Sequence, residues 1–336
     1  MAKLISWDAS EVTCNNGVTF GANSIPRRIP IRTSRPPQAQ PRVIYDFALG
    51  EEGRALSMVA SMGGRGRTFG VDLEPALAAA RFTPQKAVTQ CQVTFTQTIT
   101  PYDEASLADL ITLVIHSRRA PVPKDTWPRF VEGDCFASRA RQLERHTPDY
   151  RKLPKRPGAN NWVMISYNID EDGAPFGIET VGGNGEPKLE AASKKALSDS
   201  RWVDEDPRTG CWRYDFTAAD VIPAPEAPDL AQFGEWPDAC EADDRWAKAP
   251  KLAYPKHYQR RGIEGWAIFR YDVASWGQIG NIELLDAQPT KELGEAAKRV
   301  LSSALYKKTQ GGLTGCIEKV VFRLPEKGAG RPEGAE

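Results

Sequence analysis

The chain lacks an excess of charge of either sign. Its 336 residues contain 44 Lys and Arg against 44 Asp and Glu, so the formal net charge at pH 7 is zero. A protein that binds nucleic acid by neutralising phosphates usually carries a basic excess. The basic clusters here are short and lie among acidic residues, as at Arg260 and Arg261. The composition therefore argues against a nucleic-acid partner.

Long apolar runs are also missing. A helix that spans a bilayer needs about 18 consecutive apolar residues, whereas the longest candidate, residues 107–115, is about half that length and contains Asp109 and Thr112. The first residues, MAKLISWDASEVTC, lack the apolar segment of a secretory signal. We therefore expect no membrane span in this chain. Because the cysteines described below favour an oxidising compartment, we also expect that a signal peptide has been removed.

Signatures of catalysis or metal binding are scarce. The three histidines, His116, His146 and His257, stand in unlike contexts, and the absence of a CxxC pair excludes zinc-ribbon and thioredoxin-type motifs. The loop GGRGRTFG at 63–70 lacks the Gly-Lys-Ser/Thr ending of a phosphate-binding loop. The turn DEDG at 170–173 lacks the rest of a calcium-binding loop. We predict a protein that is not an enzyme and that has no metal or cofactor.

What the chain does contain is a regular set of six cysteines. In order, they are Cys14, Cys91, Cys135, Cys211, Cys240 and Cys316. Taken as consecutive pairs they are 77, 76 and 76 residues apart, although the intervals between the pairs are unequal. Six cysteines allow 15 connectivities, and only consecutive pairing respects this period. The alternative is six unrelated buried thiols, as in many cytosolic proteins.

The residues between the paired cysteines repeat as well. Three segments of alternating apolar and polar residues, typical of half-buried strands, end in a hairpin glycine. These glycines are Gly53, Gly173 and Gly277. An aromatic residue stands six positions before each glycine (Phe47, Tyr167, Tyr271) and another 29 positions after it (Phe82, Trp202, Tyr306). A second strand, a segment of helical period and a last strand beginning at the second cysteine complete the unit.

The repeat predicts an α+β protein of three tandem modules. Each would be a three-stranded antiparallel sheet with one helix on one face, in the order β-β-α-β, closed by a disulfide. The predicted boundaries are 1–100, then 101–220 with an extra N-terminal helix, then 221–324, then a disordered tail at 325–336. The proline-rich stretch 223–230 reads as an extended spacer between modules.

The third copy resembles the C-terminal domain of TonB-type energy transducers. The resemblance covers YPKHYQRRGIEGWAIFRYDVASWGQIGNIELL and the following ELGEAAKRVLSSALYK, about 70 residues. The matching features are Tyr254, Pro255, Gly262, Gly265, Gly277, Ala296, Ala297 and Tyr306. The first copy resembles the family less, and the second copy shows a weaker resemblance again.

This resemblance implies a periplasmic setting in a Gram-negative bacterium, which agrees with the disulfides. In that family the domain contacts a short peptide of an outer-membrane transporter along a strand edge, which is β-augmentation. On the last strand of the third copy, the candidate partner-binding residues are Ile317, Lys319, Val321 and Arg323. In the alternative, one face of this strand packs on the helix and the other is solvated.

The predicted function is that of a soluble periplasmic binding or scaffold protein. Its partner would be a protein or peptide, and an outer-membrane or envelope protein is the expected kind. The alternative function is that of an energy transducer for outer-membrane transport, with its membrane anchor outside this chain.

Overall fold

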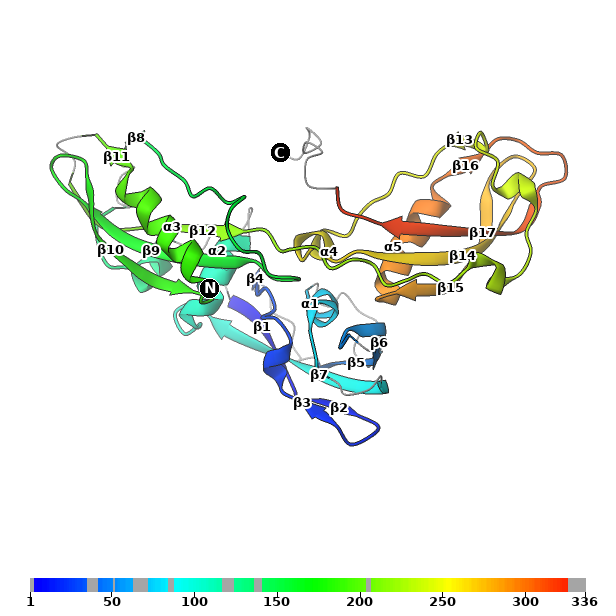
Figure 1. Ribbon diagram of the computed structural model, residues 1–336, viewed down its shortest axis with the longest axis horizontal. Helices are drawn as coiled ribbons and strands as arrows, with labels where there is room; N and C mark the ends of the chain where they lie inside the picture. The colour runs from blue at the N-terminus through cyan, green and yellow to red at the C-terminus, as the bar shows by residue number, and fades with distance from the viewer. Residues whose placement is uncertain are drawn as a thin grey trace.

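The computed structural model describes residues 3–34, 42–50, 52–62, 72–83, 88–116, 124–135, 141–203 and 207–325. It confirms the α+β class: each of three units combines an antiparallel sheet with a helix (Figure 1). We call them the first, second and third modules. The loop at 63–70 and residues 326–336 of the predicted tail lie outside the described residues.

The first module has a larger sheet than the sequence predicted. The repeat unit consists of β5 (Arg42–Leu49), β6 (Ala55–Met62), α1 (Leu73–Ala79) and β7 (Val88–Pro101). Four further strands bring the sheet to seven: β1 (Lys3–Ala9), β2 (Val12–Cys14), β3 (Thr19–Phe20) and β4 (Ile31–Thr33). They are accommodated because β7 has 14 residues, and β1 pairs along its second half from Lys3↔Pro101 to Ala9↔Phe95.

The second module keeps the predicted three strands. Its elements are β9 (Asn161–Ile169), β10 (Pro175–Gly183), α3 (Pro187–Ser198) and β12 (Arg208–Thr217). The strand order is β10-β9-β12. The predicted extra helix is present as α2 (Leu107–His116), and its Leu110 and Ile111 pack with Met164 of β9. Smaller elements are η2 (Lys124–Arg129) and the pair β8 (Gln142–Glu144) with β11 (Arg201–Trp202).

The third module repeats the same plan. Its elements are β14 (Gly265–Val273), β15 (Ile279–Gln288), α5 (Lys291–Ser302) and β17 (Leu313–Phe322), with strand order β15-β14-β17. A short pair, β13 (Trp246–Lys248) with β16 (Leu305–Tyr306), lies at one end. The helix α4 (Lys256–Arg260) precedes the sheet, and the turns η3 (Leu230–Phe233) and η4 (Asp238–Cys240) come earlier.

The hairpin glycines have the same role in all three modules. Gly53, Gly173 and Gly277 have φ of +71°, +72° and +95°, a region that favours glycine. Each glycine carbonyl accepts a hydrogen bond from the backbone N–H of the aromatic residue 29 positions later, at 3.0, 2.9 and 2.9 Å. The three modules therefore repeat this hydrogen bond as well as the sequence pattern.

The other landmarks meet beside this bond. The aromatic residue before each glycine lies directly opposite the second cysteine in the ladder: Phe47↔Cys91, Tyr167↔Cys211 and Tyr271↔Cys316. It also packs on the later aromatic residue, with ring centroids 6.0, 5.2 and 6.3 Å apart. The disulfides join Cys14 to Cys91, Cys135 to Cys211 and Cys240 to Cys316, the same pairs that the spacing predicts.

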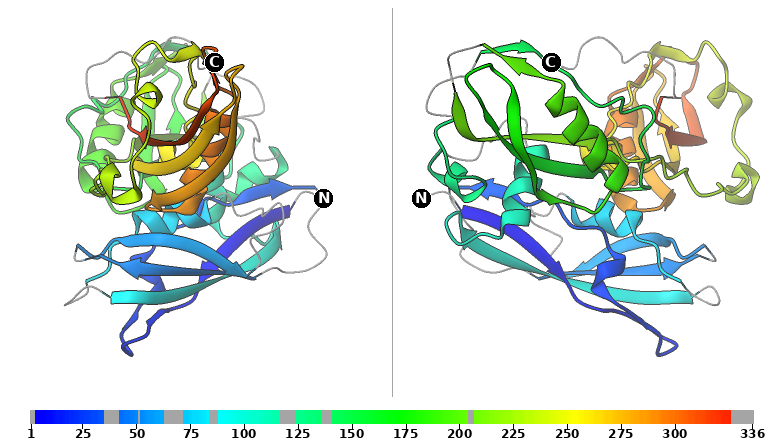
Figure 2. Two further views of the ribbon diagram at one scale, coloured as in Figure 1. Left: turned by 90° about the vertical axis from the view of Figure 1, so that its right-hand side faces the viewer. Right: turned by 60° about the vertical axis from the view of Figure 1, so that its left-hand side comes forward.

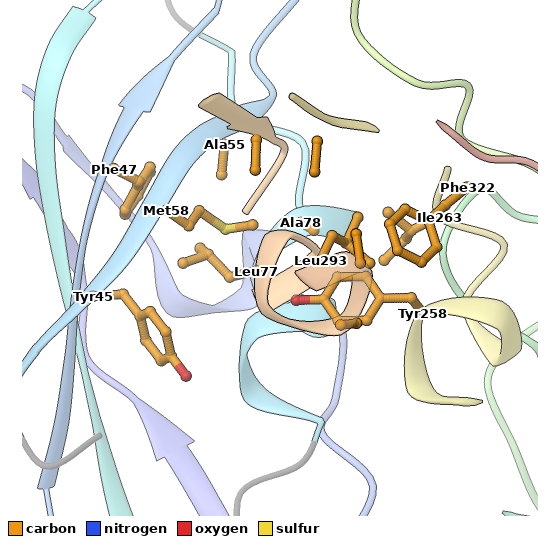
Figure 3. Close-up of a cluster of buried hydrophobic side chains, with 14 of the residues drawn as sticks. Tyr45, Phe47, Ala55, Met58, Leu77, Ala78, Tyr258, Ile263, Leu293 and Phe322 are labelled. Carbon is orange, nitrogen blue, oxygen red and sulfur yellow. The ribbon is translucent and has the colours of Figure 1, made fainter. Parts of the chain in front are cut away.

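The first and third modules share one hydrophobic core. Figure 3 shows Leu77 and Ala78 of α1 beside Leu293 of α5 and Tyr258 of α4, and all four side chains are buried. The backbone N–H of Met58 in β6 donates to the carbonyl of Pro289, at 3.2 Å. In both views of Figure 2 the blue and cyan sheet of the first module lies below the other two modules. The module boundaries given by the sequence remain predictions, and the structure adds that two modules pack as one body.

Candidate protein-binding site on the third module

The strand β17 forms one edge of the third sheet. It pairs with β14 on its inner side, and within the described ranges no strand pairs with its outer side. Residues 249–255, which connect β13 to α4, belong to no ladder. An edge of this kind presents backbone N–H and C=O groups that can pair with another chain.

The four predicted binding residues differ in their surroundings. Ile317 is 3% exposed and clusters with Trp266 and Ile268 of β14, and Val321 packs against the same cluster. Lys319 and Arg323 are exposed, and Arg323 lies one residue beyond the end of β17. Ile317 therefore stabilises the module itself, which leaves Lys319 as the exposed side chain of this set on the strand.

A segment of this chain covers the cluster around Ile317. Ala224, Ala227, Leu230, Phe233 and Trp236 pack on it. The indole N–H of Trp266 donates to the carbonyl of Pro225 at 2.8 Å, and Arg270 Nη2 donates to the carbonyl of Phe233 at 2.6 Å. The proline-rich stretch, which the sequence predicted to be an extended spacer between modules, is therefore packed against the third sheet. It covers the sheet face opposite α5.

The other face of β17 is held by packing and by a polar network. Phe322 is fully buried in the shared core, and Val320 packs against it. Glu318 accepts hydrogen bonds from Arg245 Nη2 at 3.1 Å and from the Tyr271 hydroxyl at 3.4 Å. Burial raises the pKa of Glu318, although the nearby Arg245 opposes this shift.

The same network continues to the disulfide. The hydroxyls of Tyr271 and Tyr306 are 2.7 Å apart, and Tyr306 donates to the carbonyl of Cys240 at 3.1 Å. Cys240 is bonded to Cys316, which lies on β17 next to Ile317. The first half of β17 is therefore fixed covalently and by hydrogen bonds, so its outer edge is a preorganised surface.

Sequence reasoning missed the residues that fix this strand from a distance. The stretch before the recognised repeat supplies Trp236, Phe233 and Arg245, and its sequence has no helical or strand period that predicts a contact with β17.

Two further observations concern metal binding and membrane spanning. In the part of the chain that the structure describes, no group of three or more His, Cys, Asp or Glu side chains is placed to hold an ion. No described helix is long and apolar enough to cross a membrane.

These features define the third module as a disulfide-closed α+β unit with a preorganised strand edge. Its residues 250–323 match the family described as Gram-negative bacterial TonB protein C-terminal, so this module is a TonB C-terminal-like domain. The resemblance expected from the sequence is confirmed there. For the first and second modules, resemblance to the family stays a prediction.

One curated relative is the "Protein TonB" of Salmonella typhimurium. It is 31% identical to this chain over 71 residues, which are 21% of this chain and 29% of that protein. The match thus spans less than a third of the relative's length. The expectation that this chain is not an enzyme stays a prediction.

Proposed function

We propose that this protein is a periplasmic binding or scaffold protein whose third module pairs with an extended peptide of an envelope protein. The observation that carries the proposal is the outer edge of β17, within a module that matches the TonB C-terminal family. Backbone hydrogen bonds along the edge would supply affinity, and alternate side chains of the peptide would supply selectivity.

The surroundings of the edge support this function. The Cys240–Cys316 bond and the Glu318 network hold β17 in place, so little ordering entropy is lost when a peptide binds. Lys319 and Arg323 are exposed and cationic, and they favour a peptide with acidic residues. The covered face around Ile317 does not take part, because residues of the 224–236 segment already occupy it.

Site-specific photocrosslinking tests the proposal. A photoreactive residue in place of Lys319 is compared with one in place of Glu295, which is exposed on α5 of the same module. Both proteins are mixed with periplasmic and outer-membrane fractions. We expect one defined envelope protein to crosslink from position 319 and not from position 295. Equal labelling from both positions, or none from position 319, would contradict edge binding.

The pairing mode is tested with the peptide found by crosslinking. N-methylation removes single backbone donors, so methylation at alternate positions should weaken binding while the intervening positions tolerate it. Since one charge-neutral hydrogen bond contributes about 0.5 to 1.5 kcal/mol, we expect a loss of about two- to tenfold per blocked donor. Uniform effects along the peptide would indicate recognition through side chains alone.

The second candidate is an energy transducer, and the match to "Protein TonB" favours it. Such a transducer needs a segment that reaches the inner membrane, which would lie outside the residues of the match. The native protein would then remain with the inner membrane after a carbonate wash. A scaffold would appear in the periplasmic fraction.

A further inference from the structure

A cavity of about 260 Å³ lies where the three modules meet. Residues from each module line it: Arg27 from the first, Arg156 and Asn184 from the second, and Arg261 from the third. His116, at the end of α2, completes the wall. The cavity is remote from the β17 edge in sequence and is built from different elements.

Arg261 forms the rigid part of the wall. Its side chain is 5% exposed, and Nε and Nη2 donate to the two carboxylate oxygens of Asp72 at 2.7 and 2.5 Å. Nη1 donates to the carbonyl of Gly158 at 2.9 Å, and Nη2 donates to the carbonyl of Arg27 at 2.8 Å. One guanidinium therefore binds all three modules, and its position is fixed before any ligand arrives.

Two further arginines add donors at the opening. Arg27 uses Nε and Nη2 for Asp109, at 3.1 and 2.6 Å, and its Nη1 has no hydrogen-bond partner among the residues that the structure describes. The exposed Arg156 forms no ion pair with an acidic residue among those the structure describes. Three guanidinium groups thus line the cavity, and the carboxylates of Asp72 and Asp109 balance two of them.

Asn184 adds a fixed neutral side chain to the lining. Asn184 Oδ1 accepts the backbone N–H of Trp162 at 3.0 Å, and its Nδ2 donates to the carbonyl of Asn160 at 2.9 Å. A longer bond from Nδ2 to Asn161 Oδ1, at 3.5 Å, engages the second N–H. The amide is therefore fixed in orientation, and the arginines supply the donors for a ligand.

The pKa of His116 reflects the positive charge around this cavity. Burial first, and then the positive charges of Arg260 and Arg261, lower its pKa to about 4, with Asp72 opposing. The imidazole is therefore neutral at pH 7, in a field that disfavours a further cation.

We infer that this cavity binds a small oxyanion, a carboxylate or phosphate group, held by the free donors of Arg27 and Arg156. Guanidinium groups match the geometry of both anions. The volume lies below the roughly 300 to 1,000 Å³ of ordinary ligand pockets, so the ligand is small or inserts a single anionic group. Because its walls come from three modules, a bound anion would stabilise their mutual arrangement.

Calorimetric titration at constant ionic strength tests the inference, with inorganic phosphate and succinate as separate probes. The variant Arg156→Gln removes donors from the opening. The matched control Arg151→Gln removes an arginine of the same module whose side chain is 94% exposed and pairs with Asp149. We expect saturable binding of at least one probe, weakened about fivefold to tenfold in R156Q and unchanged in R151Q. The probe that binds shows whether the cavity takes a phosphate or a carboxylate group.

Proton NMR supplies a second readout, because the chain has three histidines. A bound anion should raise the pKa of His116 from about 4 toward its ordinary value. Chloride at the same ionic strength should not have this effect. The inference is overturned if neither probe binds at millimolar concentration, or if R151Q weakens binding as much as R156Q.

Discussion

At the scale of single residues, Gly277 occupies a position that no larger residue can take. Its φ is +95°, and a Cβ built on it would lie 2.1 Å from the carbonyl oxygen of Tyr306. That contact exists because Gly277 accepts the N–H of Tyr306, so the hydrogen bond and the need for glycine have one cause. The sequence pattern predicted a hairpin turn at this glycine, but it did not predict that Tyr306 comes so close to it.

Replacing Gly277 with alanine should lower the free energy of unfolding by about 2 to 3 kcal/mol, from the left-handed backbone and the displaced Tyr306 carbonyl. Gly280→Ala is the matched control, since a Cβ there meets nothing within 4 Å. Chemical denaturation of both variants measures the difference. Similar losses in G277A and G280A would show that the turn tolerates a side chain.

Glu74 and Glu292 form a pair of like charge between α1 and α5. The Tyr258 hydroxyl donates to Glu292 at 3.0 Å, and the charge of Glu292 acts on Glu74. Burial, and then the neighbouring Glu292, raise the pKa of Glu74 well above its ordinary value. Two neighbouring carboxylates repel each other, so the raised pKa makes this contact between modules depend on pH.

The stability that comes from the raised pKa of Glu74 is complete below its ordinary value of 4.5 and is lost as pH rises through the folded value. Glu74→Gln mimics the protonated form, so this variant should be more stable than the wild type at neutral pH and should lose less stability between pH 4.5 and pH 8. Glu295→Gln, an exposed change on α5, should retain the wild-type profile. Denaturation midpoints across this pH range give the comparison. Parallel profiles for wild type and E74Q would contradict the raised pKa of Glu74.

At the scale of elements, β17 shows what a periodic pattern can and cannot predict. The alternation of its residues and the cysteine at position 316 predicted the strand and its disulfide. The pattern could not show which face is solvated, because Ile317 is buried by Phe233 and Trp236, which follow the predicted spacer at 223–230. Such packing depends on contacts about 80 residues apart, which no local period records.

Removing the Cys240–Cys316 bond should loosen this strand in particular. The double variant Cys240→Ala/Cys316→Ala should be about 4 kcal/mol less stable, because a closed loop of 76 residues is released in the unfolded chain. Hydrogen exchange of the β17 amides should accelerate. Cys14→Ala/Cys91→Ala opens a loop of nearly equal length in the first module and should leave β17 protected. If both variants expose β17 equally, the bond does not hold the edge locally.

At the scale of the whole molecule, the junction around Arg261 is the feature that the sequence pattern predicted least. Within the pair Arg260-Arg261 it looks like part of a solvated basic cluster, yet its side chain is 5% exposed and binds Asp72, 189 positions earlier. The repeat predicted three similar modules and gave no information on how they pack. Contacts between modules involve residues that differ from copy to copy, so a repeat pattern cannot reveal them.

Arg261→Ala should cost about 3 to 5 kcal/mol, because it leaves the Asp72 carboxylate buried without its partner. The double variant Arg261→Met/Asp72→Leu removes both charges and should be considerably more stable than R261A. Lys307→Ala breaks the exposed pair with Asp244 and should change little. Chemical denaturation ranks the three variants. A double variant no better than R261A would show that hydrogen bonds to Gly158 and Arg27, rather than charge pairing, dominate.

The core shared by the first and third modules determines where the chain can be cut. The family match at residues 250–323 invites expression of that segment alone. Such a fragment would expose the apolar surface of Leu293 and Tyr258 that α1 covers in the whole chain (Figure 3). A contiguous apolar surface of this kind promotes aggregation. The smallest soluble piece that retains the β17 edge therefore has to include the first module, although the two are separated by the entire second module in sequence.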